Sequence, residues 1–541
     1  MSKQLRISII IVLIPIFSWA DHYPINKQAD VLHYSFSLTL SDSTNEIVGT
    51  SYIKVRFMNA GVNQFRLDLA NQTEQRQGKG MKVDAISSES KSLLYTHNND
   101  ALLIHLNNPT KEGEEIVFLI QYHGIPADGL RIGATKFGDR SFFNENWPNR
   151  TRHWLPTIDH PYDKATSEFI VTAPAKYKVV SNGLLLEESD LGNNKRLTHW
   201  KQSVPVSSWL FVLGVAEFAV QYVDQFEGKS IQTWVYSKNR EAGFYDFAAP
   251  TKQVLEYYTK YVGPFAYEKL ANIQTPSVNG GMETSSAIFY GEDLVNGKRD
   301  ERTRNVVIHE IAHQWFGNAV TESTWDDAWL SEGFATYFTL LFIEHAYSKE
   351  EFQKGLQKAK KAVLDMSSKW PNYSIVADRT AEKEAVTNNL TYQKGAWILH
   401  MLRLLIGDMA FQKGIQSYYQ KYYNANTTTD LFRMEMEKAS GKKLEQFFKQ
   451  WLYQPSLPKL KTEWTYDAKL KQLKIHVNQL QEGGAYFSMP LELGYYEKGK
   501  SKPTLVTVQI NQQQQNFTFQ LSQAPDKITV DPNNKLIAQI L

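Results

Sequence analysis

The period of the hydrophobic residues changes twice along this chain, and this feature constrains the fold most strongly. Apolar and polar residues alternate from about residue 31 to residue 219, and they alternate again after about residue 457. Such alternation indicates strands with one buried face. Between about residues 250 and 455, apolar residues recur every three or four positions, which indicates helices. The alternation is clear at Tyr34, Phe36, Leu38 and Leu40, and the helical period at Trp397, Met401, Leu402 and Leu405.

These changes predict the domain organisation. A chain of 541 residues is too long for a single hydrophobic core. We therefore predict a multidomain α+β protein with an N-terminal antiparallel β domain at 21–219 and a mainly helical domain at 220–456. A small β-sandwich domain follows at 457–541, because its short alternating runs are typical of that architecture.

The first twenty residues have the features of a signal peptide. Lys3 and Arg6 precede an apolar stretch from residue 7 to residue 17, and small residues follow at Ser18 and Ala20. We expect cleavage before Asp21 and export to the periplasm or the medium of a bacterium. An uncleaved membrane anchor is the alternative, but the apolar stretch is short for a membrane span.

The net charge and the lack of cysteine exclude some classes of partner and of metal ligand. Removing Lys3 and Arg6 from the 59 basic residues leaves 57, against 57 acidic residues. This balance predicts no nucleic-acid partner and no attachment to an anionic membrane once the signal peptide is removed. The chain has no cysteine, so its stability does not depend on disulfides. Any metal ion must therefore be held by His, Asp or Glu.

The stretch "NVVIHEIAHQWFGN" at residues 305–318 contains an HExxH motif. Two histidines four positions apart on a helix project from the same face, so His309 and His313 can bind one metal ion. Apolar residues surround the pair, and an unpartnered pair of buried histidines would be costly. The alternative is a chance match in which each histidine is hydrogen-bonded inside a core.

A third ligand strengthens the prediction of a metal site. Metzincins supply a further histidine after a glycine, but Phe316 and Ala319 occupy those positions here. Gluzincins use a glutamate from the following helix, and Glu332 in "AWLSEGFATYF" lies nineteen residues after His313. Two histidines and one glutamate leave a position open for water, which is the catalytic arrangement of zinc. We predict one Zn²⁺ per chain, although cobalt or manganese can occupy such ligands.

Several segments together resemble the zinc aminopeptidases related to aminopeptidase N and leukotriene hydrolase. They are "HEIAHQWFGN", "WLSEGFATY", "NGGMETSSAIFYGED", "DHPYDKATSEFIVTAPAKYKVVSNG", "YVGPFAYEKLANIQTP" and "YQKGAWILHML". The resemblance covers most of residues 30–455. It implies a thermolysin-like catalytic domain, peptide substrates, and hydrolysis of the amino-terminal peptide bond. Many relatives also carry a large helical C-terminal domain, and we expect none here.

The resemblance also implies roles for single residues. His309, His313 and Glu332 hold zinc, and Glu310 is the general base that acts on zinc-activated water. Tyr392 in "TYQKG" matches the family tyrosine whose hydroxyl stabilises the oxyanion.

In the family, the "GGMET" loop lies along the substrate. Gly280 and Gly281 let the backbone approach the peptide, Met282 belongs to the same surface, and Glu283 binds the free α-ammonium group. Thr284 and Ser331 replace asparagines that are usual in the family, and both are expected outside the metal ligands. A side chain of the β domain also binds the amino terminus in many relatives, and Asn144, Glu145 and Asn146 are the residues considered for that role.

Two other functions remain open at this stage. A peptide-binding protein could retain the zinc site without turnover, although the presence of Glu310 and Tyr392 argues against this. An epoxide hydrolase is chemically possible because the same zinc could activate an epoxide oxygen, but no motif indicates a lipid pocket. We predict a zinc metallo-aminopeptidase.

Overall fold

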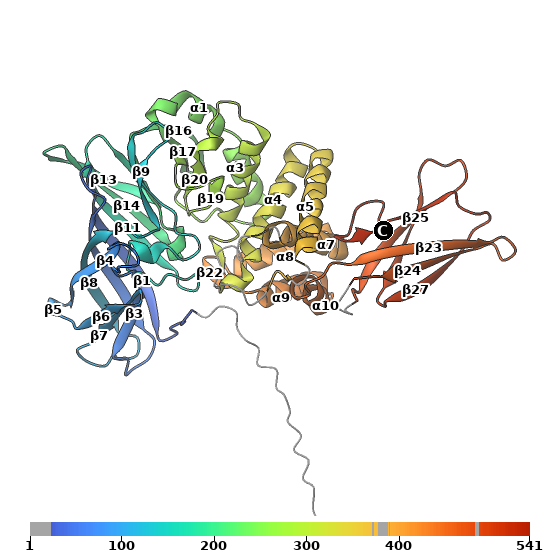
Figure 1. Ribbon diagram of the computed structural model, residues 1–541, viewed down its shortest axis with the longest axis horizontal. Helices are drawn as coiled ribbons and strands as arrows, with labels where there is room; N and C mark the ends of the chain where they lie inside the picture. Colours follow the sequence, from blue (N-terminus) through green and yellow to red (C-terminus); the bar gives the residue numbers. More distant parts are fainter. Residues whose placement is uncertain (1–22, 371–372, 377–387, 389, 482–485) are drawn as a thin grey trace, which may run out of the picture.

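A computed structural model describes residues 23–370, 373–376, 388, 390–481 and 486–541. The chain follows a path from an N-terminal β region, through a region rich in helices, to a separate C-terminal β region (Figure 1). The predicted α+β class is thereby confirmed. The predicted signal peptide lies outside the described residues. Within the described part of the chain, no helix has the length and hydropathy that a membrane crossing requires.

The N-terminal region is built on a sheet of eight strands. Their order is β13-β14-β11-β1-β2-β8-β4-β5. The pairing differs from the predicted antiparallel pattern at one place, because β1 and β11 run parallel from His33/Thr166 to Thr39/Thr172. The chain between these two strands forms other strands of the region, so β11 returns to β1 over a long connection that permits a parallel pair. The strands are β1 (Ala29–Thr39), β2 (Ile47–Phe57), β4 (Gly80–Ser88), β5 (Lys91–Ser92), β8 (Glu115–Ile125), β11 (Ala165–Pro174), β13 (Leu184–Gly192) and β14 (Lys195–Val206).

Two smaller sheets complete this region. One has the order β3-β7-β6, with β3 (Gln64–Asp68), β6 (Tyr95–Asn98) and β7 (Ala101–His105). The other has the order β12-β15-β10-β9, with β9 (Leu130–Ala134), β10 (Arg140–Asn144), β12 (Lys178–Ser181) and β15 (Leu213–Ala216). Alternating side chains of β1 are buried, as the hydrophobic period predicts, because one face of the strand packs on the core.

The central region begins with a five-stranded sheet of order β16-β17-β18-β20-β19. Its strands are β16 (Phe218–Phe226), β17 (Lys229–Tyr236), β18 (Lys269–Thr275), β19 (Gly281–Met282) and β20 (Ala287–Gly291). The helices are α1 (Arg240–Phe247), α2 (Thr251–Tyr261), α3 (Glu301–His313), α4 (Trp329–Ala346), α5 (Lys349–Lys369), α7 (Gly395–Ile406), α8 (Asp408–Lys421), α9 (Thr429–Ser440) and α10 (Glu445–Phe448). A short parallel pair joins β21 (Val320–Glu322) to β22 (Ala425–Thr427). Leu390–Lys394 (η6) and Lys449–Tyr453 (η7) are π-helical turns.

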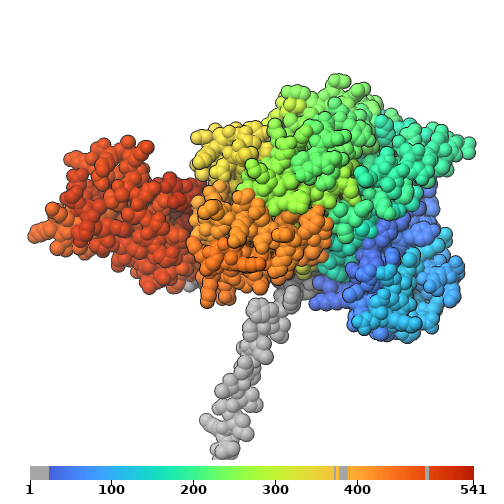
Figure 2. All heavy atoms as spheres, turned by 180° about the vertical axis from the view of Figure 1, so that it is seen from behind, coloured from blue at the N-terminus to red at the C-terminus, as the bar shows by residue number. Residues whose placement is uncertain are grey.

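The C-terminal region consists of two sheets, of orders β27-β24-β23-β29 and β26-β25-β28. The strands are β23 (Lys459–Asp467), β24 (Gln472–Gln479), β25 (Met489–Tyr496), β26 (Thr504–Ile510), β27 (Gln514–Gln520), β28 (Lys527–Val530) and β29 (Gln539–Ile540). This region projects from the end of the molecule opposite to the N-terminal β region (Figure 2). Lys360 of α5 links the C-terminal region to the helices, because its ammonium group donates hydrogen bonds to Leu536 O at 2.7 Å and to Asn534 Oδ1 at 2.8 Å.

A half-buried lysine connects the N-terminal β region to the loop that follows α3. The ammonium group of Lys164 donates to the carbonyl oxygens of Asn318 (3.0 Å) and Ala319 (2.9 Å). The side-chain amide of Asn318 in turn donates to Glu283 O at 2.6 Å. One chain of hydrogen bonds therefore extends from the β region through this loop to the "GGMET" segment.

Candidate active site

Helix α3 presents the two histidines of the HExxH motif on one face, as predicted. Asp300 caps the helix, since its carboxylate accepts a hydrogen bond from Thr303 N at 2.9 Å. The Nε2 atoms of His309 and His313 face each other at 3.1 Å. His313 is 1% exposed, so its ring is held by the core.

Glu332 reaches the same point from the first turn of α4. Its Oε2 lies 3.5 Å from His309 Nε2 and 3.3 Å from His313 Nε2. Aromatic packing holds α4 to the turn that follows α3, since the ring of Phe316 lies 4.8 Å from that of Phe334 and 4.6 Å from that of Phe338. The buried aromatic residues of α4 thus bring the glutamate to the histidines.

The three atoms fit a zinc ion. A zinc ion about 2.05 Å from tetrahedral ligand atoms separates those atoms by about 3.3 Å, and the three observed separations are 3.1, 3.3 and 3.5 Å. Oε2 of Glu332 is buried and makes no hydrogen bond with any described residue. A buried carboxylate oxygen without a donor requires a cation to offset its desolvation. His309, His313 and Glu332 would hold the ion, and the three form a metal-ligand group by their mutual distances.

The other ring nitrogen of His313 is held by neighbouring atoms. Nδ1 lies 3.1 Å from Phe316 O and 3.0 Å from Ser331 Oγ. A proton on Nδ1 directed at a carbonyl leaves the lone pair of Nε2 free for a metal. Ser331 lies outside the metal-ligand group, as expected, and the structure places its hydroxyl in contact with a histidine of that group. The sequence carried no signal for this contact, since it depends on how α4 packs on α3.

Neighbouring charges shift the pKa values of His313 and Glu332 in opposite directions. Burial alone would lower the pKa of His313, but the carboxylates of Glu283 and Glu332 raise it to about 10. Burial alone would raise the pKa of Glu332, but His313 and His309 lower it to about 2. These shifts keep Glu332 ionised, as a metal ligand must be, whereas a metal ion that binds Nε2 of His313 displaces the proton that the carboxylates favour there.

The carboxylate of Glu310 lies within 4.8 Å of a ring nitrogen of His313 and packs against Gly281. A Cβ atom on Gly281 would lie 2.2 Å from Glu310 Oε1 and 2.3 Å from its Cδ. Burial, together with the neighbouring Glu283 carboxylate, holds the pKa of Glu310 well above its ordinary value. Gly281 was expected to bring the backbone close to a peptide, and the structure shows that it also makes room for this carboxylate. Gly280 adopts φ +86°, which favours glycine.

Glu283 lies beside Glu310, in the same buried cluster. Ligand atoms of Glu283, Glu310 and His313 all lie within 4.8 Å of one another. Oε1 of Glu283 makes no hydrogen bond with a described residue, and burial raises the pKa of this group to about 7. The backbone carbonyl of Glu283 accepts from Gln314 Nε2 at 3.0 Å, so the loop is held to α3. The arrangement leaves a buried carboxylate, with Oε1 unpaired among the described residues, next to the metal-ligand atoms.

The hydroxyl group of Tyr392 donates to Glu332 Oε1 at 2.7 Å. Its ring lies nearly parallel to that of His309, with the centroids 6.1 Å apart. The predicted tyrosine is therefore at the site, but in this structure it holds the zinc-binding carboxylate.

Met282 is buried in β19, where it pairs with Phe289. The Thr284 hydroxyl donates a hydrogen bond to Ala287 O at 2.5 Å, so its partner in this bond is a backbone carbonyl and not a metal-ligand atom.

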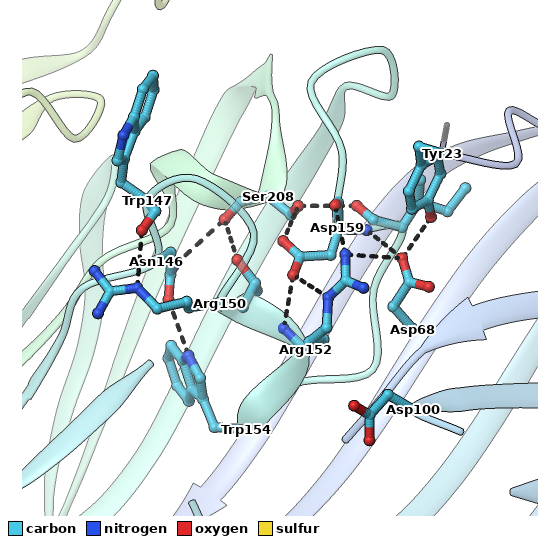
Figure 3. A network of polar contacts seen from close by, with 12 residues as sticks. Tyr23, Asp68, Asp100, Asn146, Trp147, Arg150, Arg152, Trp154, Asp159 and Ser208 are labelled. Carbon is cyan, nitrogen blue, oxygen red and sulfur yellow. Dashed lines mark hydrogen bonds and ion pairs between the residues drawn. The ribbon is translucent and has the colours of Figure 1, made fainter. Parts of the chain in front are cut away.

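Asn144 and Asn146, two of the residues considered for amino-terminus binding, form hydrogen bonds within the N-terminal β region. Asn144 donates to Phe211 O at 2.8 Å, and Asn146 accepts from Trp154 Nε1 at 3.0 Å within the polar network of Figure 3. Glu145 pairs with Arg150 and lines a separate cavity of about 390 Å³. Both amides are occupied by these structural bonds, so neither is oriented to receive a peptide.

A cavity of about 550 Å³ opens beside His309 and Tyr392. It is formed mainly by α3, α4 and the η6 turn, with apolar and polar side chains on its walls. The other described residues that line it are Glu301, Arg302, Asn305, Val306, Thr336, Thr339, Leu340, Ile343, Lys358 and Gln393. The cavity therefore adjoins the metal-ligand group at His309.

Gly317 should be essential to the metal site, although no sequence motif assigned it a role. It adopts φ +106°, and a Cβ atom there would lie 2.2 Å from Ser331 Oγ and 3.3 Å from His313 Nδ1. We expect Gly317→Ala to displace Ser331 and to weaken zinc binding by about tenfold or more, because contacts to metal ligands of this kind contribute that much. Chelator competition measures the affinity, and Gly138→Ala, at an exposed positive-φ turn with open space around it, is the control. Unchanged affinity in Gly317→Ala would contradict the expectation.

Glu322 should make stability depend on pH. It is 0% exposed, neither carboxylate oxygen has a hydrogen-bond partner among the described residues, and burial raises its pKa from 4.5 to about 8. Between these values the folded protein keeps a proton that the unfolded chain releases, so the free energy of unfolding contributed by this group falls as pH rises. Glu322→Gln should therefore gain stability relative to wild type, by on the order of 2 kcal/mol at pH 8 and by little at pH 5.

Thermal unfolding of Glu322→Gln and wild type at pH 5, 6.5 and 8 measures this difference. The exposed residue Glu112 offers the control, and Glu112→Gln should show no such trend. A difference between Glu322→Gln and wild type that is constant with pH would show that Glu322 is ionised throughout.

The fold and the three-ligand site define a gluzincin, the class of metallopeptidases with an HExxH helix and a glutamate from the next helix. The model of the Peptidase family M1 domain matches residues 246–451, and that of the Peptidase M1 N-terminal domain matches residues 30–210. The chain belongs to peptidase family M1, and zinc is the metal of the solved structures that it matches.

Curated relatives match part of the chain. Glutamyl aminopeptidase of Rattus norvegicus is 31% identical over 325 residues, which cover 58% of this chain and 34% of that protein. Probable aminopeptidase 2 of Sulfurisphaera tokodaii is 29% identical over 392 residues, which cover 70% of this chain and 48% of that protein. The matched part thus spans about a third to a half of the length of these relatives.

Solved structures match more of the chain. The M1 zinc metallopeptidase of Deinococcus radiodurans is 26% identical with a TM-score of 0.68, and the match covers 80% of this chain and 95% of that one. A mutant two-domain M1 zinc metallopeptidase bound to L-tryptophan is 25% identical with a TM-score of 0.69, over 80% of this chain and 96% of that one.

Proposed function

We propose that this protein is a zinc-dependent aminopeptidase that hydrolyses the amino-terminal peptide bond of peptides. The observation that carries the proposal is the position of Glu283, a buried acid whose Oε1 has no hydrogen-bond partner among the described residues, in one cluster with Glu310 and His313. A carboxylate at this point offers a partner to a free α-ammonium group. An internal peptide bond has no such cation, so the arrangement favours the first residue of a peptide.

The residues of the site have separate roles in the proposed reaction. Zinc, when bound by His309, His313 and Glu332, supplies a Lewis acid that polarises the scissile carbonyl and activates water. Glu310 takes the proton from the attacking water and delivers it to the leaving amine. Its raised pKa suits this exchange, because an acid that holds its proton more tightly is a better base.

Tyr392 is proposed to donate to the oxyanion of the substrate. Its hydroxyl is hydrogen-bonded to Glu332 Oε1 at 2.7 Å, so it lies beside the zinc-binding groups. The cavity beside His309 and Tyr392 would receive the remainder of the peptide. Gly280, Gly281 and Met282 are proposed to line the side of the site on which Glu283 lies.

The first test uses aminoacyl amides that release a fluorophore. Alanyl, leucyl, arginyl and glutamyl amides are compared with their N-acetylated forms, before and after chelation and zinc restoration. Zinc-dependent cleavage of the free amides alone is expected, and Glu283→Gln should lose most of this discrimination because the counter-ion of the ammonium group is gone. Equal cleavage of acetylated substrates by wild type would remove Glu283 from its role. No cleavage by zinc-loaded protein would overturn the proposal.

We also propose that the protein is exported to the periplasm or the medium of a bacterium. The basic and apolar pattern of the first twenty residues supports this, and the absence of cysteine suits a chain that does not depend on disulfides outside the cytoplasm. Amino-terminal sequencing of the protein recovered from the periplasmic fraction of an expressing bacterium is expected to begin at Asp21. A full-length chain in the cytoplasmic fraction would contradict export.

A further inference from the structure

Two glycines face each other where α4 packs against the start of α7. A Cβ atom on Gly333 would lie 2.9 Å from Gly395 Cα and 3.0 Å from its carbonyl carbon. A Cβ atom on Gly395 would lie 2.8 Å from Gly333 Cα. In each case the obstacle is backbone, which cannot rotate away as the end of a side chain can. Any residue other than glycine at either position therefore forces the two helices apart.

This contact lies directly beside two residues of the metal site. Glu332 precedes Gly333 on α4, and Tyr392 lies three residues before Gly395, in the η6 turn that leads into α7. A Cβ atom on Gly333 would also approach Thr391 O to 3.2 Å, so the η6 turn itself touches the glycine. The 2.7 Å hydrogen bond from the Tyr392 hydroxyl to Glu332 Oε1 also joins the η6 turn to α4.

The distances indicate how sensitive this bond is. Nonbonded carbon atoms are normally about 3.5–4.0 Å apart, so an added methyl group would move the backbones apart by about 1 Å. An O–H···O bond of 2.7 Å lengthened by about 1 Å is no longer a hydrogen bond. Glu332 would then lose the donor that holds Oε1 while Oε2 faces the two histidines.

We propose that Gly333 and Gly395 are positioning residues whose backbone contact sets the Tyr392–Glu332 bond and thereby directs Glu332 Oε2 at the zinc site. The inference rests on the proposed function for its catalytic consequence. Its structural consequence, an effect on zinc affinity, does not require turnover. Tyr392 thus acts in the resting protein as the donor that orients a zinc ligand.

The test compares Gly395→Ala, Tyr392→Phe and the double variant with wild type, using chelator competition for zinc affinity and the alanyl amide for kcat/KM. Gly395→Ala and Tyr392→Phe are each expected to weaken zinc binding by about tenfold, the effect typical of lost contacts to metal ligands. In the Tyr392→Phe background, Gly395→Ala should weaken zinc binding by no more than about twofold further, because the bond it sets is already absent. The effects on kcat/KM should be similarly non-additive.

Gly414→Ala provides a matched control for a glycine at a helix contact. Its Cβ atom would meet the flexible Met436 side chain of α9, and α8 contributes no residue to the metal site. This variant should lose some thermal stability and keep its zinc affinity. Equal losses of zinc affinity from Gly395→Ala in both backgrounds would show that the glycine acts only through packing, and would overturn the proposal.

Tyr392→Phe keeps the proposal testable if Gly395→Ala does not fold. Unchanged zinc affinity in Tyr392→Phe would overturn it, whether or not the protein hydrolyses the amide. A wild-type protein that binds zinc but cleaves no aminoacyl amide would refute the proposed function alone.

Discussion

Glu310→Gln should abolish hydrolysis of aminoacyl amides while zinc remains bound at one ion per chain. Glutamine keeps the shape of the side chain, which packs against Gly281, but it cannot take a proton from water. Loss of a general base costs about 10² to 10⁴ in rate, and we expect a loss of about 10³ in kcat/KM. The measurement is kcat/KM on the alanyl amide, with the zinc content of the same sample determined by elemental analysis.

The exposed residue Glu350 at the start of α5 provides the control, and Glu350→Gln should keep full activity. If Glu310→Gln retains more than about a tenth of the activity, another group is the base. Loss of zinc in this variant would make Glu310 a ligand, a role that its place in a second cluster with Glu283 and His313 allows geometrically.

His313→Ala should remove zinc and activity together. The substitution deletes one of three ligand atoms and leaves the buried Glu332 carboxylate with one imidazole in place of two. Zinc that is present at a thousandfold above its dissociation constant stabilises the folded protein by about 4 kcal/mol. Chelation should therefore lower the Tm of wild type clearly and leave the Tm of His313→Ala unchanged.

Zinc content and Tm with and without chelator test this prediction. The exposed residue His345 at the end of α4 offers a control, and His345→Ala should behave as wild type does toward chelation. A full complement of tightly bound zinc in His313→Ala would refute the assignment of this histidine. A Tm of wild type that does not respond to chelation would show that the site contributes nothing to stability.

The two predictions separate the binding of zinc from the use of water. Glu310→Gln is expected to lose chemistry and keep the metal, whereas His313→Ala is expected to lose both. Glu283→Gln forms a third class, in which the metal and the base remain but the requirement for a free amino terminus is relaxed. An aminopeptidase should show all three behaviours, and a peptide-binding protein without turnover would show only the loss of zinc.

The metal-binding triad could be predicted from the sequence because its geometry is largely local. Two histidines four residues apart on one helix must lie on the same face, whatever the rest of the fold does. Glu332 follows at a short distance in a helix with an apolar face, so the connection between the two helices restricts where it can lie. The hydrophobic period likewise predicted strands, helices and strands in the order found, since burial of one face depends on each element's own pattern.

Contacts between distant segments were decided only by the tertiary structure. The parallel pairing of β1 with β11, the link from Lys164 to the loop after α3, and the packing of Glu310 on Gly281 each join residues that are far apart in the chain. The same holds for the Gly333–Gly395 contact and for the bond from Tyr392 to Glu332. Local residue pattern specifies which face of an element is apolar, but the distance between two elements depends on the packing of all the side chains between them. The sequence by itself therefore determined which residues can hold a metal ion together, and the tertiary structure decided which neighbours hold those residues in place.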